Sequence, residues 1–225
     1  MVRVLVLVEG QTEERFVTDV LAPYFMLKKI FLIPKILTTK FVKNGPDFKG
    51  GVSNYRQIKK HLDNLLGDTE AYVTTLIDYY GLPADTPGMS DRPNGTPLDR
   101  VLHVESAIHT RFQSERRFLP FLMLHEFEAL LFSDVSELAG VIPAREKIEL
   151  LNAEMNGREP EAINDNPSTA PSKRILRILP GYQKTLHGPT AAKRIGLNVI
   201  RQKCHHFHGW IEKLEGLLNL SLIHI

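Results

Sequence analysis

A run rich in Val and Leu extends from Val2 to Val8 at the start of the chain, is apolar from Val4 to Val8, and ends at Glu9 and Gly10. It shows no strict alternation, which is typical of a strand buried on both faces of a parallel sheet. A helical spacing of apolar residues follows, with Thr12 as its expected N-cap. A strand, a glycine turn and a helix open a βαβ unit, so this feature predicts an α/β fold.

The same alternation of strands and helices continues along the chain. Further strands are predicted at residues 31–39, 71–77 and 118–124, the first at a sheet edge or with an irregular start because it contains Pro34. Helices are predicted at 58–66 and 99–112, with a Gly-rich loop at 45–51 and a long loop at 82–97. After Asp134 the expected elements are all helical: 145–155, 172–179 and one long final helix at 198–220.

This organisation predicts two parts. Residues 1–134 form an α/β core with a mostly parallel sheet, and residues 135–225 form a basic, helical C-terminal extension packed on it. The single cysteine, Cys204, excludes an internal disulfide. No apolar stretch approaches the ~18 residues of a membrane helix, and the first apolar run is too short for a secretory signal. We therefore expect a cytoplasmic protein with no membrane partner.

The net charge of +2 hides an uneven distribution. Residues 166–211 contain no Asp or Glu and eight Lys or Arg, so the rest of the chain, with 20 basic and 26 acidic residues, carries −6. A basic surface beside an acidic one suits an enzyme that holds a polyanion on the first and cations on the second. The alternative is a solvated pair of basic helices. Lys173, Arg174 and Lys184 are the candidate phosphate contacts, beside residues 181–188, which are expected to form a loop.

Acidic residues follow three of the predicted strands. Glu9, Asp78 and Glu126 each come just after a buried run. The carboxyl ends of parallel strands share one sheet edge, so these carboxylates are expected to converge there and to bind Mg²⁺ or Mn²⁺. The alternative for each is a turn or a helix cap. Glu128 is a further metal candidate, ranked below Glu126 because it is expected to lie in the next helix.

Four segments resemble a family of uncharacterised bacterial Toprim-like domains, distantly related to overcoming-lysogeny-defect nucleases. They are Glu9-Gly10-Gln11-Thr12-Glu13, Ile77-Asp78-Tyr79-Tyr80-Gly81, His125-Glu126-Phe127-Glu128-Ala129-Leu130-Leu131-Phe132 and Pro171-Ser172-Lys173-Arg174. The resemblance implies a Toprim-like core that binds Mg²⁺, with Glu9 as general acid or base. The usual Asp-x-Asp motif reads Asp78-Tyr79-Tyr80 here. Either Glu126 or Glu128 therefore replaces the second acid, or the site is degenerate and the domain only binds.

Two functions follow as hypotheses. The first is a Mg²⁺-dependent nuclease, with Glu9, Asp78 and Glu126 as catalytic and metal-binding residues and with His125 and Glu13 as further candidates. By analogy with relatives of such domains, it would act beside an ABC-type ATPase in anti-phage defence. The second is a non-catalytic interaction or regulatory subunit that docks a partner ATPase or nucleic acid. A zinc site at residues 204–208 is not expected, because consecutive histidines on a helix point apart.

Overall fold

The computed structural model describes residues 1–37, 54–163, 166 and 169–222. The predicted loop at 45–51 and the end of the second predicted strand lie outside these ranges. The sheet contains β1 (Val2–Val8), β2 (Ile30–Ile36), β3 (Ala71–Asp78), β4 (Phe118–Leu119) and β5 (Leu122–Met123). Its order is β2-β1-β3-β4, with β5 also on β3, and every described pairing is parallel. The predicted α/β class with a mostly parallel sheet is confirmed.

Proline explains two features of this sheet. Pro34 lies in the edge strand β2, as predicted, where a missing N–H costs no central ladder bond. The fourth predicted strand is wrong as a single element, because Pro120 separates β4 from β5. The Thr75 hydroxyl bridges the gap: it donates to the Phe121 carbonyl at 2.6 Å and accepts from the Phe121 N–H at 2.8 Å.

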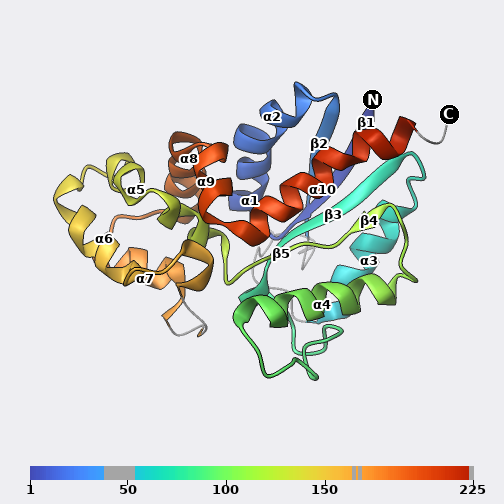
Figure 1. The fold of residues 1–225 in the computed structure, drawn as a ribbon, viewed down its shortest axis with the longest axis horizontal. Helices are drawn as coiled ribbons and strands as arrows, with labels where there is room; N and C mark the ends of the chain where they lie inside the picture. Colours follow the sequence, from blue (N-terminus) through green and yellow to red (C-terminus); the bar gives the residue numbers. More distant parts are fainter. Residues whose placement is uncertain (38–53, 164–165, 167–168, 223–225) are drawn as a thin grey trace, which may run out of the picture.

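Alternate residues of β1 enter two hydrophobic layers. Val4 and Val6 join the layer that contains α1 (Gln11–Phe16), α2 (Ala22–Met26) and α10 (His205–Leu222). Leu5 and Leu7 join the opposite layer, with α3 (Tyr55–Leu66) and α4 (Pro97–Arg111). The sheet is therefore covered on both faces (Figure 1), which is why β1 is apolar without alternation from Val4 to Val8.

The first helix begins differently from the prediction. Gly10, not Thr12, is its N-cap, and the Gly10 N–H donates to the Glu13 carboxylate at 3.0 Å. The helix continues through a π-helical turn at Val17–Leu21 into α2. Thr12 is buried instead. A cap was expected at Thr12 because Ser and Thr are common caps, but the glutamate takes that role here.

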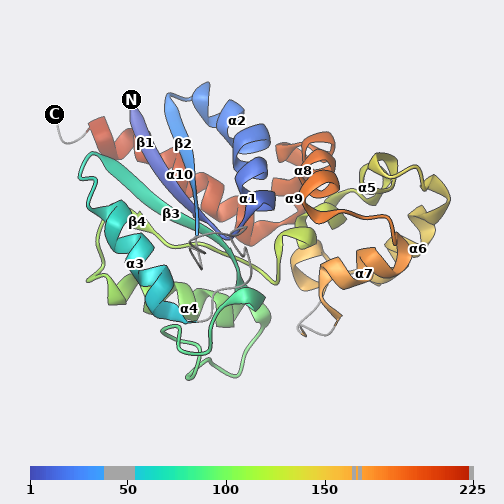
Figure 2. The ribbon, with the colours of Figure 1, turned by 180° about the vertical axis from the view of Figure 1, so that it is seen from behind.

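Short helices make up the rest of the chain. They are α5 (Val135–Val141), α6 (Ile148–Met155), α7 (Pro171–Ile178), α8 (Lys184–Ile195) and α9 (Leu197–Lys203). Figures 1 and 2 show α5, α6 and α7 at the end of the molecule opposite the N-terminus. Among the elements whose residues are all described, 3₁₀ turns lie at Tyr79–Gly81, Phe127–Ser133, Arg145–Lys147 and Pro160–Ala162.

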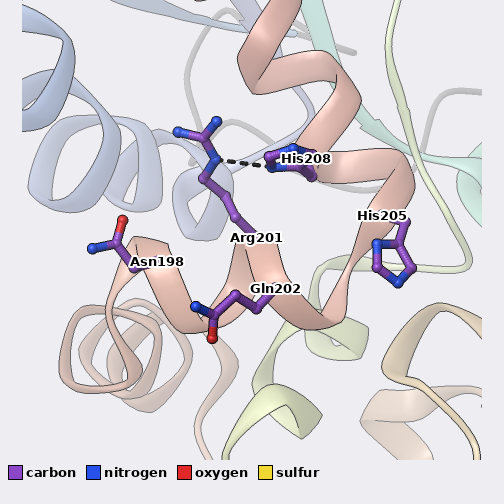
Figure 3. Close-up of a pocket in the computed structure, with 5 residues that line it drawn as sticks. All are labelled: Asn198, Arg201, Gln202, His205 and His208. Carbon is purple, nitrogen blue, oxygen red and sulfur yellow. Dashed lines mark hydrogen bonds between the residues drawn. The ribbon is translucent and has the colours of Figure 1, made fainter.

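The predicted single final helix is wrong, because the chain turns a corner between α9 and α10 at Cys204. The Arg201 Nε–H donates to His208 Nδ1 across this corner at 3.1 Å (Figure 3). Ile200, Cys204 and Phe207 all remain buried in one hydrophobic cluster. The apolar periodicity thus continues through the break, so the sequence pattern does not indicate it. No helix in the described ranges has the length and apolar character needed to cross a bilayer.

Candidate functional site

Five carboxylates gather at the carboxyl edge of the sheet. Glu9 follows β1, Asp78 ends β3, Glu13 lies in the first turn of α1, and Glu126 and Glu128 follow β5. Of the described residues, one lysine places its ammonium among them. Lys184 Nζ, from α8, is 3.0 Å from Glu128 Oε2 and 3.8 Å from Asp78 Oδ2. We call these five acids and Lys184 the carboxylate cluster.

A close approach of Gly81 positions Glu9. The Asp78 N–H donates to Glu9 Oε2 at 3.4 Å, which links the ends of β1 and β3. A Cβ atom added at Gly81 would lie 2.9 Å from the same Glu9 oxygen. Only glycine lets the turn after β3 pass this near the carboxylate without a shift.

Asp78 and Glu128 form the buried part of the cluster. The Phe127 N–H donates to Asp78 Oδ1 at 2.9 Å and thereby fixes the turn that carries Glu128 inward. The Tyr182 hydroxyl donates to Glu128 Oε1 at 3.2 Å, and Glu128 is fully buried. Burial, followed by the nearby Glu128 charge, raises the pKa of Tyr182, so this hydroxyl stays protonated and able to donate.

Glu126 lies at the border of the cluster. Its Oε1 accepts a hydrogen bond from the Ser172 N–H at 2.5 Å, at the start of α7. His125, immediately before it, is fully buried with a left-handed φ of 70°. The His125 Nε2 atom lies 3.1 Å from the Glu161 carbonyl. The sequence ranks Glu126 above Glu128, whereas in the structure Glu128 lies deeper and touches the lysine.

Burial raises the pKa values of four acids in this cluster. For Glu9, burial acts first and the neighbouring Glu13 charge second. Burial likewise raises the pKa of Glu13, raises that of Asp78 well above its usual range, and raises that of Glu128 to about 7. Burial alone would lower the pKa of Lys184, but the negative charges of Glu128, Asp78 and Glu126 outweigh it and raise that pKa. The cluster therefore holds an excess of negative charge that protons or a cation must neutralise.

The donor set suits a hard divalent cation, since Mg²⁺ and Mn²⁺ prefer carboxylate oxygens. Five carboxylates share one ammonium, so the chemistry of the set fits such an ion. In their present arrangement, no three or more His, Cys, Asp or Glu side chains of the described residues are placed to hold one ion together. Lys184 contacts Glu128 and Asp78 instead.

The three predicted phosphate contacts have different surroundings. Lys184 belongs to the carboxylate cluster, and Lys173 is exposed on α7. Arg174 pairs with Glu154 at 3.2 Å and donates to the Ile163 carbonyl at 3.3 Å, so it ties α7 to α6 and the following turn.

The expected loop at 181–188 is wrong in its second half. Lys184 and the residues after it belong to α8. A Cβ at Gly188 would lie 2.9 Å from the Tyr182 hydroxyl and 3.0 Å from the Phe127 ring, so this glycine lets α8 pack against the cluster. The sequence gives no signal for the contacts of Tyr182 and Gly188, which depend on tertiary packing.

A separate polar hollow of about 420 Å³ lies at the corner between α9 and α10 (Figure 3), and no residue of the cluster lines it. Its walls are Asn198, Arg201, Gln202, His205 and His208. The Arg201 guanidinium makes bonds of 3.0 and 3.1 Å with the Glu215 carboxylate. The positive charge in this hollow is therefore already neutralised.

The similarities of this chain to known structures and to one family span nearly its whole length. No curated protein matches it significantly. The C-terminal region of the Burkholderia pseudomallei OLD protein is 16% identical, with a TM-score of 0.44, over 95% of this chain and 99% of that one. The C-terminal region of the Xanthomonas campestris pv. campestris OLD protein is 15% identical, with a TM-score of 0.42, over 98% of each chain. The family described as "Domain of unknown function (DUF4276)" matches residues 8–215, and the chain belongs to that family.

Proposed function

We propose that the chain is a Mg²⁺- or Mn²⁺-dependent phosphodiesterase that cleaves nucleic acid. The observation that carries the proposal is the gathering of five carboxylates around one ammonium at the carboxyl edge of a parallel sheet. Ligands of open α/β sheets bind at this edge. The resemblance of the Glu9 segment to the first Toprim motif supports the same chemistry.

Each acid has a role in this proposal. Glu9 is the general acid or base, because its raised pKa lets it exchange a proton nearer neutrality. Asp78, Glu126 and Glu128 would hold the ion, together with Glu9, and Glu13 orders the turn at Gly10. A bound divalent ion supplies charge neutralisation at the phosphoryl oxygens.

The setting is part of the same proposal. Lys173 and the other exposed bases of residues 166–211 would hold the phosphate backbone. By the Toprim-like resemblance, the chain would work in the cytoplasm beside an ABC-type ATPase, in defence against phage.

Calorimetric titration of Mn²⁺, paired with cleavage of labelled single- and double-stranded oligonucleotides, tests this function. We expect Glu9→Gln and Asp78→Asn to weaken Mn²⁺ binding at least about tenfold and to abolish cleavage that EDTA also stops. Glu14→Gln is the matched control, because Glu14 takes no part in the contacts of the cluster described above. Wild-type protein that neither binds Mn²⁺ nor cleaves would refute the proposal.

Two observations favour a second function, a non-catalytic docking module. Lys184 already pairs with Glu128 inside the cluster, and Tyr80 stands where an Asp-x-Asp motif has its second acid. Such a module would bind nucleic acid or a partner ATPase with equal affinity in EDTA and in Mg²⁺. Metal-dependent cleavage abolished by Glu9→Gln excludes it.

A further inference from the structure

Lys184 occupies an unusual position for a lysine. It is the first residue of α8, where the partial positive charge of the helix N-terminus disfavours a cation. Its ammonium is nevertheless 3.0 Å from a Glu128 carboxylate with no solvent exposure and 3.8 Å from Asp78, which is 10% exposed. The attraction of the acids therefore holds the side chain in place.

The acids have other partners, but these are neutral. Backbone N–H groups donate to Glu9, Glu13, Asp78 and Glu126. Among the ion pairs of the described residues, those of Lys184 are the ones that reach the cluster. The lysine side chain is itself 42% exposed, so part of it faces solvent while its ammonium contacts the Glu128 carboxylate.

We propose that Lys184 is the resident counter-ion of the carboxylate cluster, that its ammonium takes the place of a divalent cation, and that it must leave before such a cation binds. The inference rests on the proposed metal binding. The ammonium contacts carboxylate oxygens of Glu128 and Asp78 that would ligate the ion, so the two cations compete for the same oxygens and repel each other there.

The geometry allows the ammonium to leave without a change of fold. Ala191, Ala192 and Ile195 of α8 are buried in the core and anchor the helix. The Lys184 side chain has four methylene groups and can change rotamer while the backbone stays fixed. The freed ammonium can then reach a phosphate at the same sheet edge. Phosphate contact is the role that the sequence predicts for Lys184.

The test compares wild-type protein with Lys184→Met and with Lys193→Met, an exposed lysine on the same helix. Mn²⁺ binding is measured by calorimetry, and the Tm is measured in EDTA and in Mn²⁺. We expect Lys184→Met to bind Mn²⁺ at least about tenfold more tightly, since a competing charge is removed. Its Tm in EDTA should fall and its Mn²⁺-induced rise in Tm should grow. Lys193→Met should match the wild type in every measurement.

Two outcomes separate the hypotheses, and two further variants support the comparison. If Lys184→Met binds Mn²⁺ equally well or more weakly than a wild type that binds it, the lysine orders the ligands and the inference is overturned. If neither protein binds Mn²⁺, the proposed function itself fails. Should Lys184→Met not fold, Lys184→Gln replaces it, because the amide can still donate to Glu128, and the same tightening is required. Lys184→Arg keeps the charge and must bind Mn²⁺ no more tightly than the wild type.

Discussion

At the scale of single residues, the burial of Glu128 changes how the free energy of unfolding depends on pH. Its carboxyl group is fully buried, and its pKa is about 7, against 4.5 for an exposed glutamate. The folded state therefore binds more protons than the unfolded state between pH 4.5 and about 7. By linkage, the free energy of unfolding falls as the pH rises through this window.

We predict that Glu128→Gln removes part of this loss of stability. At about 1.4 kcal/mol for each unit of pKa, the rise from 4.5 to about 7 corresponds to a loss on the order of 3 kcal/mol between pH 4.5 and 7. Urea denaturation in EDTA at pH 5, 6 and 7 measures it. The variant should gain stability relative to the wild type as the pH rises.

Glu149→Gln, an exposed residue of α6, is the control. Its free energy of unfolding should follow that of the wild type at each pH. If the difference in free energy of unfolding between the wild type and Glu128→Gln stayed constant from pH 5 to 7, the raised pKa would be contradicted.

At the scale of elements, a distant carboxylate caps the last helix. The Glu161 side chain accepts from the His206 N–H at 2.8 Å and from the Phe207 N–H at 2.9 Å, at the start of α10. These N–H groups have no partner within the helix, and a negative charge there also suits the helix dipole. The Glu161 carboxylate thus stabilises the corner at Cys204 that divides α9 from α10.

We expect Glu161→Ala to lower the free energy of unfolding by about 1–2 kcal/mol, the usual cost of losing an N-cap. Urea denaturation can be followed through Trp210, which stacks on Phe121 with ring centroids 4.5 Å apart and so reports on the position of α10. Glu159→Ala, an exposed neighbour, should change stability by less than about 0.5 kcal/mol. Equal losses in the two variants would mean that the cap contributes nothing.

At the scale of the whole molecule, the boundary predicted at residue 134 crosses one continuous core. Val4 of β1 and Phe16 of α1 share a hydrophobic cluster with Ala192 of α8 and Phe207 of α10. The Trp210 Nε1–H also donates to the Thr74 hydroxyl of β3 at 2.9 Å. The helical extension therefore covers one face of the sheet, and it supplies Lys184 to the carboxylate cluster.

We predict that residues 1–134 alone do not fold into a stable domain. α10 alone buries five large apolar side chains, Phe207, Trp210, Ile211, Leu214 and Leu217. At ~1.5–3 kcal/mol each, their burial is comparable to the ~5–15 kcal/mol net stability of a domain. Circular dichroism of the fragment should show no cooperative thermal transition, while the full chain should show one. A cooperative transition in the fragment would make residues 1–134 an independent domain.

Local patterns in the sequence determined the α/β class and the place of the acids. A run such as Val2 to Val8 can be buried on both faces only in a covered parallel sheet, and parallel strands present their carboxyl ends at one edge. The sequence therefore predicts that Glu9 and Asp78 lie at the ends of adjacent strands, as they do in the structure. Pro34 marks the edge strand for an equally local reason, its missing N–H.

Tertiary packing decided the rest. The bond from the Phe127 N–H to Asp78 directs Glu128 inward, and the packing of Gly188 against Tyr182 brings Lys184 to it. The N–H groups that follow the break at Cys204 are bound by Glu161, far away in the chain. Periodicity and composition describe only neighbours along the chain, whereas each of these features is a contact between distant segments. Such contacts exist only once the sheet and its covering helices have assembled.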